Sequence, residues 1–169
     1  IRRRSLAGLV DELKRAEKLQ LPFVVLHPGS HVGDGEETGL KRIAENLKRA
    51  ITRTDGFTVR IALETMAGQG STLGHEFEHI AALYDAVDCD ERLGVCLDSC
   101  HMFAAGHDIA KKKGYEITVK ALDATIGISR VLAIHMNDSK HGCGECKDRH
   151  EHIGKGKIGK AGFRLLVND

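Results

Sequence analysis

Four short apolar runs divide the chain at regular intervals. They are rich in valine, isoleucine and leucine, and they cover residues 23–27, 59–65, 94–98 and 131–135. Near-continuous apolar runs of this length are typical of strands that are covered on both faces, as in a parallel sheet. We therefore predict four parallel strands whose starts lie roughly 35 residues apart, which is the spacing of βα units.

Amphipathic segments fill the intervals between these runs. Leu6, Leu9 and Leu13, for example, recur on one face of a helix. The predicted helices cover residues 3–19, 37–53, 73–86 and 116–128. Strand alternating with helix predicts an α/β fold with a parallel sheet. No GxGxxG motif follows the first strand, so a dinucleotide-binding fold has no support.

The chain has 169 residues, enough for one domain with a hydrophobic core. No linker or low-complexity segment divides it, and we treat residues 1–169 as a single domain. The chain starts without methionine inside an amphipathic pattern and stops within "FRLLVND", inside another element. We therefore expect a fragment of a longer protein.

Each predicted strand ends in a residue type that binds metal ions. The closing residues are His27, Glu64, Asp98 and His135. In a parallel barrel the carboxyl ends of the strands meet at one face, where such enzymes keep their active sites. One strand-end histidine has an ordinary structural explanation, but four matched strand ends predict a shared site. Imidazole together with carboxylate suits Zn²⁺ or Mn²⁺.

A second group of ligand-type residues follows the last predicted strand. Asp148 and His150 are two positions apart, so in an extended segment their side chains face the same way. Together with His101, three residues after Asp98, they form a candidate site for a further metal ion. The glycine-rich segment 154–159 resembles a phosphate-binding loop only loosely, and we give that interpretation little weight.

Two other motifs contain zinc-ligand residues. Cys143 and Cys146 form one CxxC pair near His141, but a single pair is weak support for a structural zinc site, and we prefer a surface loop. Segment 75–79, "HEFEH", formally matches HExxH, the zinc motif of metalloproteases. We reject a protease because this segment lies on a helix after the second strand, away from the strand ends. We expect a solvated helix face there instead.

Composition narrows the classes of function. Lys plus Arg number 25 and Asp plus Glu number 24, and this balance argues against a protein that coats nucleic acid through bulk charge. Aromatic residues make up 4% with no tryptophan, which disfavours a base-stacking platform. The five cysteines, including Cys96 and Cys100 beside Asp98, indicate reduced thiols in an intracellular protein. No apolar run approaches the roughly 18 residues of a membrane span, so no membrane partner is expected.

The ordered set of motifs resembles the endonuclease IV family, the zinc-dependent apurinic/apyrimidinic endonucleases. The matching motifs are "LHPGSH" (26–31), "LET-AGQG" (63–70), "CLDSCHMFAAGHD" (96–108), "IHMNDSK" (134–140) and "DRHEHIGKGKIG" (148–159). They cover nearly the whole chain and are more specific than any single motif. The resemblance implies a TIM-type (β/α)8 barrel, present here without its N-terminal strands and its last strand.

The resemblance also implies a reaction and a set of roles. The reaction is hydrolysis of the phosphodiester 5′ to an abasic site in double-stranded DNA, during base-excision repair, with three Zn²⁺ ions or Mn²⁺ as a substitute. Glu64 would be the catalytic residue that bridges two ions, and Gly68 and Gln69 would contact DNA. Carried over by motif position, the metal ligands are His27, Glu64, Asp98, His101, His135, Asp148 and His150.

Two other functions remain open. A metal-dependent sugar isomerase or epimerase of the same barrel class needs one or two ions, and it gives Asp148 and His150 no obvious role. A non-catalytic zinc protein is the other, although structural zinc sites are usually cysteine-rich and closed. For the intact endonuclease we expect a monomer inside the cell, in the cytoplasm of a prokaryote or in the nucleus or mitochondrion of a eukaryote.

Overall fold

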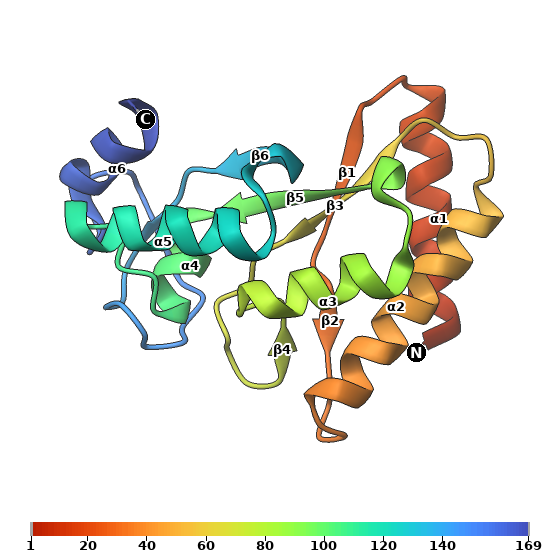
Figure 1. Cartoon of the computed structure of the whole chain (residues 1–169), viewed down its shortest axis with the longest axis horizontal. Coiled ribbons are helices and arrows are strands. Elements are labelled where there is room, and N and C mark those ends of the chain that lie inside the picture. The colour runs from red at the N-terminus through yellow and green to blue at the C-terminus, as the bar shows by residue number, and fades with distance from the viewer. Residues whose placement is uncertain (1, 169) are drawn as a thin grey trace.

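Four parallel strands form the main sheet of the computed structural model, which describes residues 2–168, with Arg2 and Arg3 described by their backbone alone. The strand order is β1-β3-β5-β6, so each strand pairs with the next one along the chain, as in a barrel wall (Figure 1). The strands are β1 (Phe23–Leu26), β3 (Arg60–Glu64), β5 (Leu93–Asp98) and β6 (Val131–His135). The four strands predicted from the apolar runs are therefore confirmed.

The strand register brings the carboxyl ends of the strands to one edge of the sheet. Leu26 of β1 is paired with Leu63 of β3, so His27 and Glu64 follow at the same level. Asp98 of β5 is paired directly with His135 of β6. Pairing in parallel thus places the strand-end residues side by side.

Helices connect the strands and pack against one another in succession, α1 on α2, α2 on α3, α3 on α5 and α5 on α6 (Figure 1). They are α1 (Arg2–Lys18), α2 (Glu36–Arg53), α3 (Phe77–Val87), α4 (Ser99–Ala105), α5 (Lys112–Thr125) and α6 (Gly159–Asn168), with short 3-10 turns η1 (Asp90–Arg92) and η2 (Ile128–Arg130). None of the helices in residues 2–168 is both long enough and apolar enough to cross a membrane.

Two predicted helices begin elsewhere than the pattern indicated. The helix expected at 73–86 starts at Phe77, because Leu73 lies in a short strand and Gly74 has a φ of 101°, outside the helical region. The helix expected at 116–128 starts at Lys112. The prediction began too late because the first turn of this helix is rich in lysine and glycine and carries no apolar stripe. Helix α4 was not predicted at all.

The hydrophobic core lies between the inner strands and the helices. All six residues of β5 are buried, as are the last four residues of β3. Leu13 of α1, Leu47 of α2 and Ile80 of α3 pack into the same cluster. The outer strands β1 and β6 are covered less completely, and Ile134 of β6 is 41% exposed.

Two small antiparallel ladders lie in the loops that follow the strands. One joins β2 (Gly29–Ser30) to β4 (Thr72–Leu73), and the other joins β7 (Asp138–Ser139) to β8 (His150–Glu151). Two-residue strands are too short to show a period along the sequence, so neither ladder was predicted. The first ladder joins the loops after β1 and β3, and the second closes the segment that follows β6 on itself.

Candidate metal centre

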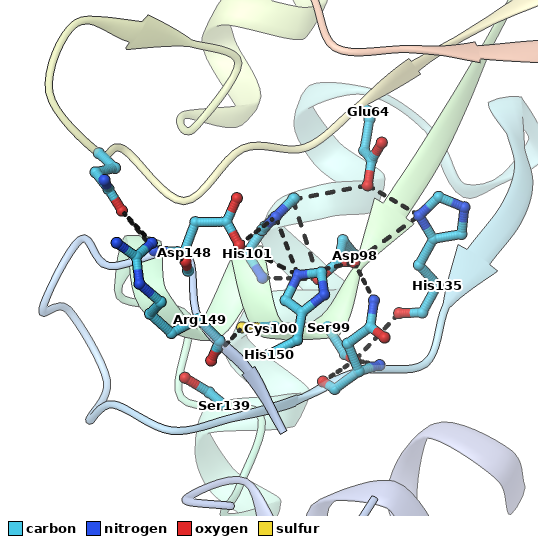
Figure 2. A network of polar contacts seen from close by, with 12 residues as sticks. Glu64, Asp98, Ser99, Cys100, His101, His135, Ser139, Asp148, Arg149 and His150 are labelled. Carbon is cyan, nitrogen blue, oxygen red and sulfur yellow. Dashed lines mark hydrogen bonds and ion pairs between the residues drawn. The ribbon is translucent and has the colours of Figure 1, made fainter. Parts of the chain in front are cut away.

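The ends of β3, β5 and β6 bring three ligand-type side chains together. The Oε1 atom of Glu64 lies 2.9 Å from Nδ1 of His135, and Oδ2 of Asp98 lies 3.8 Å from the same nitrogen. One ligand atom of each residue lies within 4.8 Å of the others. Figure 2 shows these side chains converging from adjacent strands. We call these three residues the strand-end group.

Asp98 also belongs to a second cluster, formed with His101 and His150, which we call the loop group. The Nε2 atoms of His101 and His150 are 3.4 Å apart. Asp148 Oδ1 lies 3.2 Å from Nε2 of each histidine, so the structure brings this carboxylate to the same place (Figure 2). The loop group and the strand-end group therefore share Asp98.

His27 lies beside these groups but outside both. Its Nε2 atom is 3.0 Å from Oε2 of Glu64, and its side chain is 58% exposed because it follows the outer strand β1. The two oxygens of Glu64 consequently face different imidazoles, those of His27 and His135. This arrangement is compatible with a carboxylate that is shared by two ions.

The two buried carboxylates of the site have imidazoles as their ion-pair partners. Glu64 is 3% exposed and Asp98 is 0% exposed. A buried carboxylate is costly unless a cation or several donors compensate its charge. The ion-pair partners of these two residues, within the part of the chain that the structure describes, are His27, His101, His135 and His150. A divalent cation would compensate the buried negative charge, and the donor set of imidazoles and carboxylates fits Zn²⁺.

Helix α4 fixes the orientation of His101. Asp98 is the N-cap residue, and its Oδ1 accepts the backbone N–H of His101 at 2.9 Å. Nδ1 of His101 lies 2.8 Å from the carbonyl oxygen of Thr65, so the proton is assigned to Nδ1 and the lone pair to Nε2. Metal-binding histidines in proteins are commonly oriented by such a bond to a carbonyl.

Polar residues next to the ligands hold Asp98 in place. Nδ2 of Asn137 donates to Asp98 Oδ2 at 2.5 Å, and Thr65 Oγ1 accepts the backbone N–H of Asp98 at 2.9 Å. The backbone N–H of Asn137 donates to Ser99 Oγ at 2.8 Å. The sequence reasoning missed Asn137 and Thr65. The signal that could have found them is a polar residue one or two positions after a strand-end ligand.

The cysteines beside Asp98 are not anionic ligands. Burial, together with the nearby carboxylate of Glu64, raises the pKa of the Cys96 thiol to about 12. Burial also raises the pKa of Cys100. Both groups are therefore neutral thiols at neutral pH, and thiolates are the form of cysteine that binds metal ions.

Comparison with known proteins identifies the family of this chain. A family model described as a xylose isomerase-like TIM barrel matches residues 1–169. The chain belongs to this xylose isomerase-like TIM-barrel family. Within it, "Probable endonuclease 4" of Chloroflexus aurantiacus is 48% identical over 169 residues, which are 100% of this chain and 59% of that protein. "Probable endonuclease 4" of Geobacter sulfurreducens is 46% identical over 168 residues, which are 99% and 57% of the two chains.

Solved structures show the same relationship. Endonuclease IV from Thermus thermophilus matches with a TM-score of 0.83 and 35% identity, over 98% of this chain and 57% of that one. A D-tagatose 3-epimerase-like protein matches with a TM-score of 0.71 at 22% identity, over 93% and 55% of the two chains, which shows the fold alone. The resemblance to endonuclease IV and the barrel fold class are thus confirmed. The chain spans less than two thirds of the length of each of these proteins.

Gln69, which the family resemblance assigned to DNA, contacts the segment that carries Asp148 and Arg149 in this structure. Its Oε1 accepts the backbone N–H of Asp148 at 3.0 Å and lies 3.5 Å from a guanidinium nitrogen of Arg149. Gly68 has a φ of 74°, and a side chain there would meet the ring of His75 and the sulfur of Cys146. The DNA contacts of both residues stay a prediction.

The prediction of a solvated "HEFEH" helix face is wrong. His75 precedes α3, and His79 is 7% exposed. The backbone N–H of Gly74 donates to Nδ1 of His79 at 3.3 Å, and Nε2 of His79 lies 3.5 Å from Glu36 at the start of α2. The reason for the burial is that α3 packs against α2 on this face, so His79 is a packing residue.

The CxxC pair lies in a surface loop, as expected. Cys143 and Cys146 are both exposed. The backbone N–H of Gly144 donates to the carbonyl of Phe103, and that of Cys146 donates to the carbonyl of Ala104, so the loop covers the end of α4. Neither cysteine belongs to the candidate metal groups found among residues 2–168.

Proposed function

We propose that this chain carries the metal centre of a DNA-repair endonuclease that hydrolyses the phosphodiester 5′ to abasic sites. The observation that supports this most strongly is that Asp98 belongs to both ligand groups. Two ions that share a carboxylate lie close together, and paired ions are a common device for hydrolysing phosphodiesters. The names of the 35–48% identical relatives point to the same class of reaction.

Seven residues would hold three Zn²⁺ ions. Glu64 would be shared between the ion at His27 and the ion of the strand-end group, since its two oxygens face His27 and His135. The loop group with Asp148 would hold the third ion. Bound zinc supplies Lewis acidity and makes water a stronger acid. The ligands that this chain is proposed to supply are His27, Glu64, Asp98, His101, His135, Asp148 and His150.

A hollow of about 250 Å³ beside the centre is the proposed place for the substrate. It is lined by His27 and Asp148 from the ligand set and by Gln69 and Arg149. The Arg149 guanidinium would attract a phosphate, and Gln69 would orient the Asp148 segment. An abasic nucleotide leaves the helical stack at little cost because it has no base to unstack, which would give the selectivity.

The sugar isomerase or epimerase is the weaker proposal. Its support is a likeness of fold at 22% identity, and a shared barrel does not imply a shared activity. The loop group with Asp148 would have no task in such an enzyme. The main proposal also includes abasic duplex DNA as the substrate and a location inside the cell. The bacterial relatives named endonuclease 4 support both.

The test is cleavage of a duplex oligonucleotide that carries one abasic analogue, by the whole protein to which this chain belongs. Chelation, with metal loss checked by elemental analysis, should abolish cleavage, and zinc should restore it. Glu64→Gln should lower the rate by at least about 100-fold because a bridging ligand is lost. Glu116→Gln, a change at an exposed carboxylate on α5, is the matched control and should leave the rate unchanged. Undiminished cleavage after confirmed metal loss would contradict the proposal.

A further inference from the structure

Asp138 is a buried carboxylate that the proposed mechanism does not use. It is 0% exposed and lies in β7, three residues after His135. Its two oxygens accept backbone N–H groups at 2.8 to 3.4 Å. The donors are Ser139, Gly154, Gly156, Ile158 and Gly159. One carboxylate thus binds the backbone of a whole loop.

The glycine-rich segment 154–159 binds the carboxylate of Asp138 through its backbone N–H groups. Its N–H groups point at Asp138, so the loop already encloses an anion that belongs to the chain itself. The phosphate-binding interpretation of this segment is therefore wrong. A side chain at Gly156 would lie 2.4 Å from the carbonyl oxygen of Ser139 and 2.5 Å from Oδ1 of Asp138, so this close approach requires glycine.

The short β7–β8 ladder connects Asp138 to His150 of the loop group. Ser139 of β7 is paired with His150 of β8, and Asp138 is paired with Glu151. On the other side of β7, the backbone N–H of Lys157 donates to the carbonyl of Ser139 at 2.7 Å. Strand β7 is thus held between His150 and the loop that Asp138 binds.

We propose that Asp138 is a positioning residue for the loop group, and that its bonds to the glycine-rich loop fix the ladder from which His150 reaches the metal ion. Without this acceptor, the buried N–H group of Ile158 and the partly buried N–H groups of the loop glycines would lack a partner, which destabilises this loop conformation. The ladder has two residues on each side, so it cannot hold its position alone. This inference rests on the proposed metal function.

The test is Asp138→Asn, which keeps the size of the side chain but replaces one acceptor oxygen with a donor. Zinc is titrated into the whole protein to which this chain belongs, and the imidazole ¹⁵N signals of His101, His150 and His135 are followed by NMR. We expect the zinc concentration that half-saturates the signals of His101 and His150 to rise at least about 10-fold. Hydrogen bonds that orient metal ligands typically contribute that much to metal affinity. His135 should respond as in the wild type. An unchanged response at His101 and His150 would overturn the proposal.

Glu17→Gln is the matched control. Glu17 also accepts backbone N–H groups with its carboxylate, from Thr58 at 3.0 Å and from Val59 at 2.9 Å, but at the amino end of β3. It should weaken the fold without changing the zinc response of any histidine. If it changed the response of His101 and His150 as much as Asp138→Asn does, general destabilisation would be the cause and the proposal would be wrong.

The wild-type chain provides a second measurement, which holds even if Asp138→Asn fails to fold. Coupling between zinc and the loop is reciprocal, so zinc should slow hydrogen exchange at the amides of Gly156 and Ile158 by at least about 5-fold. Unchanged exchange, in a chain whose histidines do bind zinc, would overturn the role of Asp138 alone. Absence of any zinc response at His101, His135 and His150 of the wild type would instead overturn the proposed metal function, and this inference with it.

Discussion

The carboxylate of Asp98 caps the helix that carries His101, with its Oδ1 accepting the His101 backbone N–H at 2.9 Å. Its Oδ2 lies 3.8 Å from Nδ1 of His135 and 3.9 Å from Nε2 of His150. One oxygen therefore stabilises the fold, while the other faces both ligand groups. This division explains why an apolar strand ends in an aspartate here: the residue starts α4 and joins the two groups.

Asp98→Asn should separate these two tasks. Asparagine is about as good an N-cap as aspartate, so α4 keeps its cap. The asparagine amide would, however, meet the Asn137 amide that donates to Oδ2, so the free energy of unfolding without metal should fall by about 1 to 3 kcal/mol. The charge that zinc needs is lost, so zinc binding at His135 and at His150 should fall together. Chemical denaturation and zinc titration measure the two effects. A variant that binds zinc normally would show that Asp98 is a structural residue only.

His150→Ala should lower the rate of the chemical step in the whole enzyme more than it lowers DNA affinity. The third ion is proposed to act on charge that develops during bond cleavage, which is a transition-state interaction. Single-turnover cleavage and equilibrium DNA binding should be measured separately. Equal losses in both quantities would contradict this role for the loop group.

His79→Ala should weaken the fold and spare the metal centre. The side chain is buried and its Nδ1 accepts the backbone N–H of Gly74, so its loss leaves a cavity and an unpaired N–H group. Such changes cost about 1 to 3 kcal/mol of unfolding free energy. Denaturant unfolding checks the loss, and zinc titration should match the wild type. Loss of zinc binding at unchanged stability would contradict this and indicate that the "HEFEH" segment binds metal.

His107 should make stability depend on pH. Its ring stacks on Phe77 with centroids 4.2 Å apart, and burial lowers the pKa of this imidazole below its ordinary value of 6.5, although Glu76 and Glu78 oppose the shift. The unfolded state therefore takes up a proton at a higher pH than the folded state does. The resulting stabilisation is fully present above about pH 6.5 and is lost as the pH falls through the lower folded pKa.

His107→Phe tests this pH effect because it keeps an aromatic ring beside Phe77 and removes the titrating group. Denaturation midpoints at about pH 8 and about pH 5, on either side of the ordinary imidazole pKa, should differ less in the variant than in the wild type. Equal pH dependence of the two proteins would show that His107 titrates alike in the folded and unfolded states.

The sequence predicted the sheet and the convergence of the ligand residues because both follow from local patterns. Valine- and leucine-rich runs marked the strands, and parallel pairing placed Asp98 beside His135. The role of Asp138 could not be predicted, since its N–H donors in the glycine-rich loop lie 16 to 21 residues further along the chain. The burial of His79 likewise depends on packing against Glu36, which no period along the chain records.

The measurement that tests the central claim most directly is anomalous diffraction at the zinc edge from a zinc-loaded crystal. The account predicts one peak among Glu64, Asp98 and His135, a second at the loop group with Asp148 and a third between His27 and Glu64, each about 2.0 to 2.2 Å from nitrogen and oxygen ligands. Crystals that contain zinc by elemental analysis but show no peak within that distance of Asp98 would contradict it, as would zinc bound only at Cys143 and Cys146.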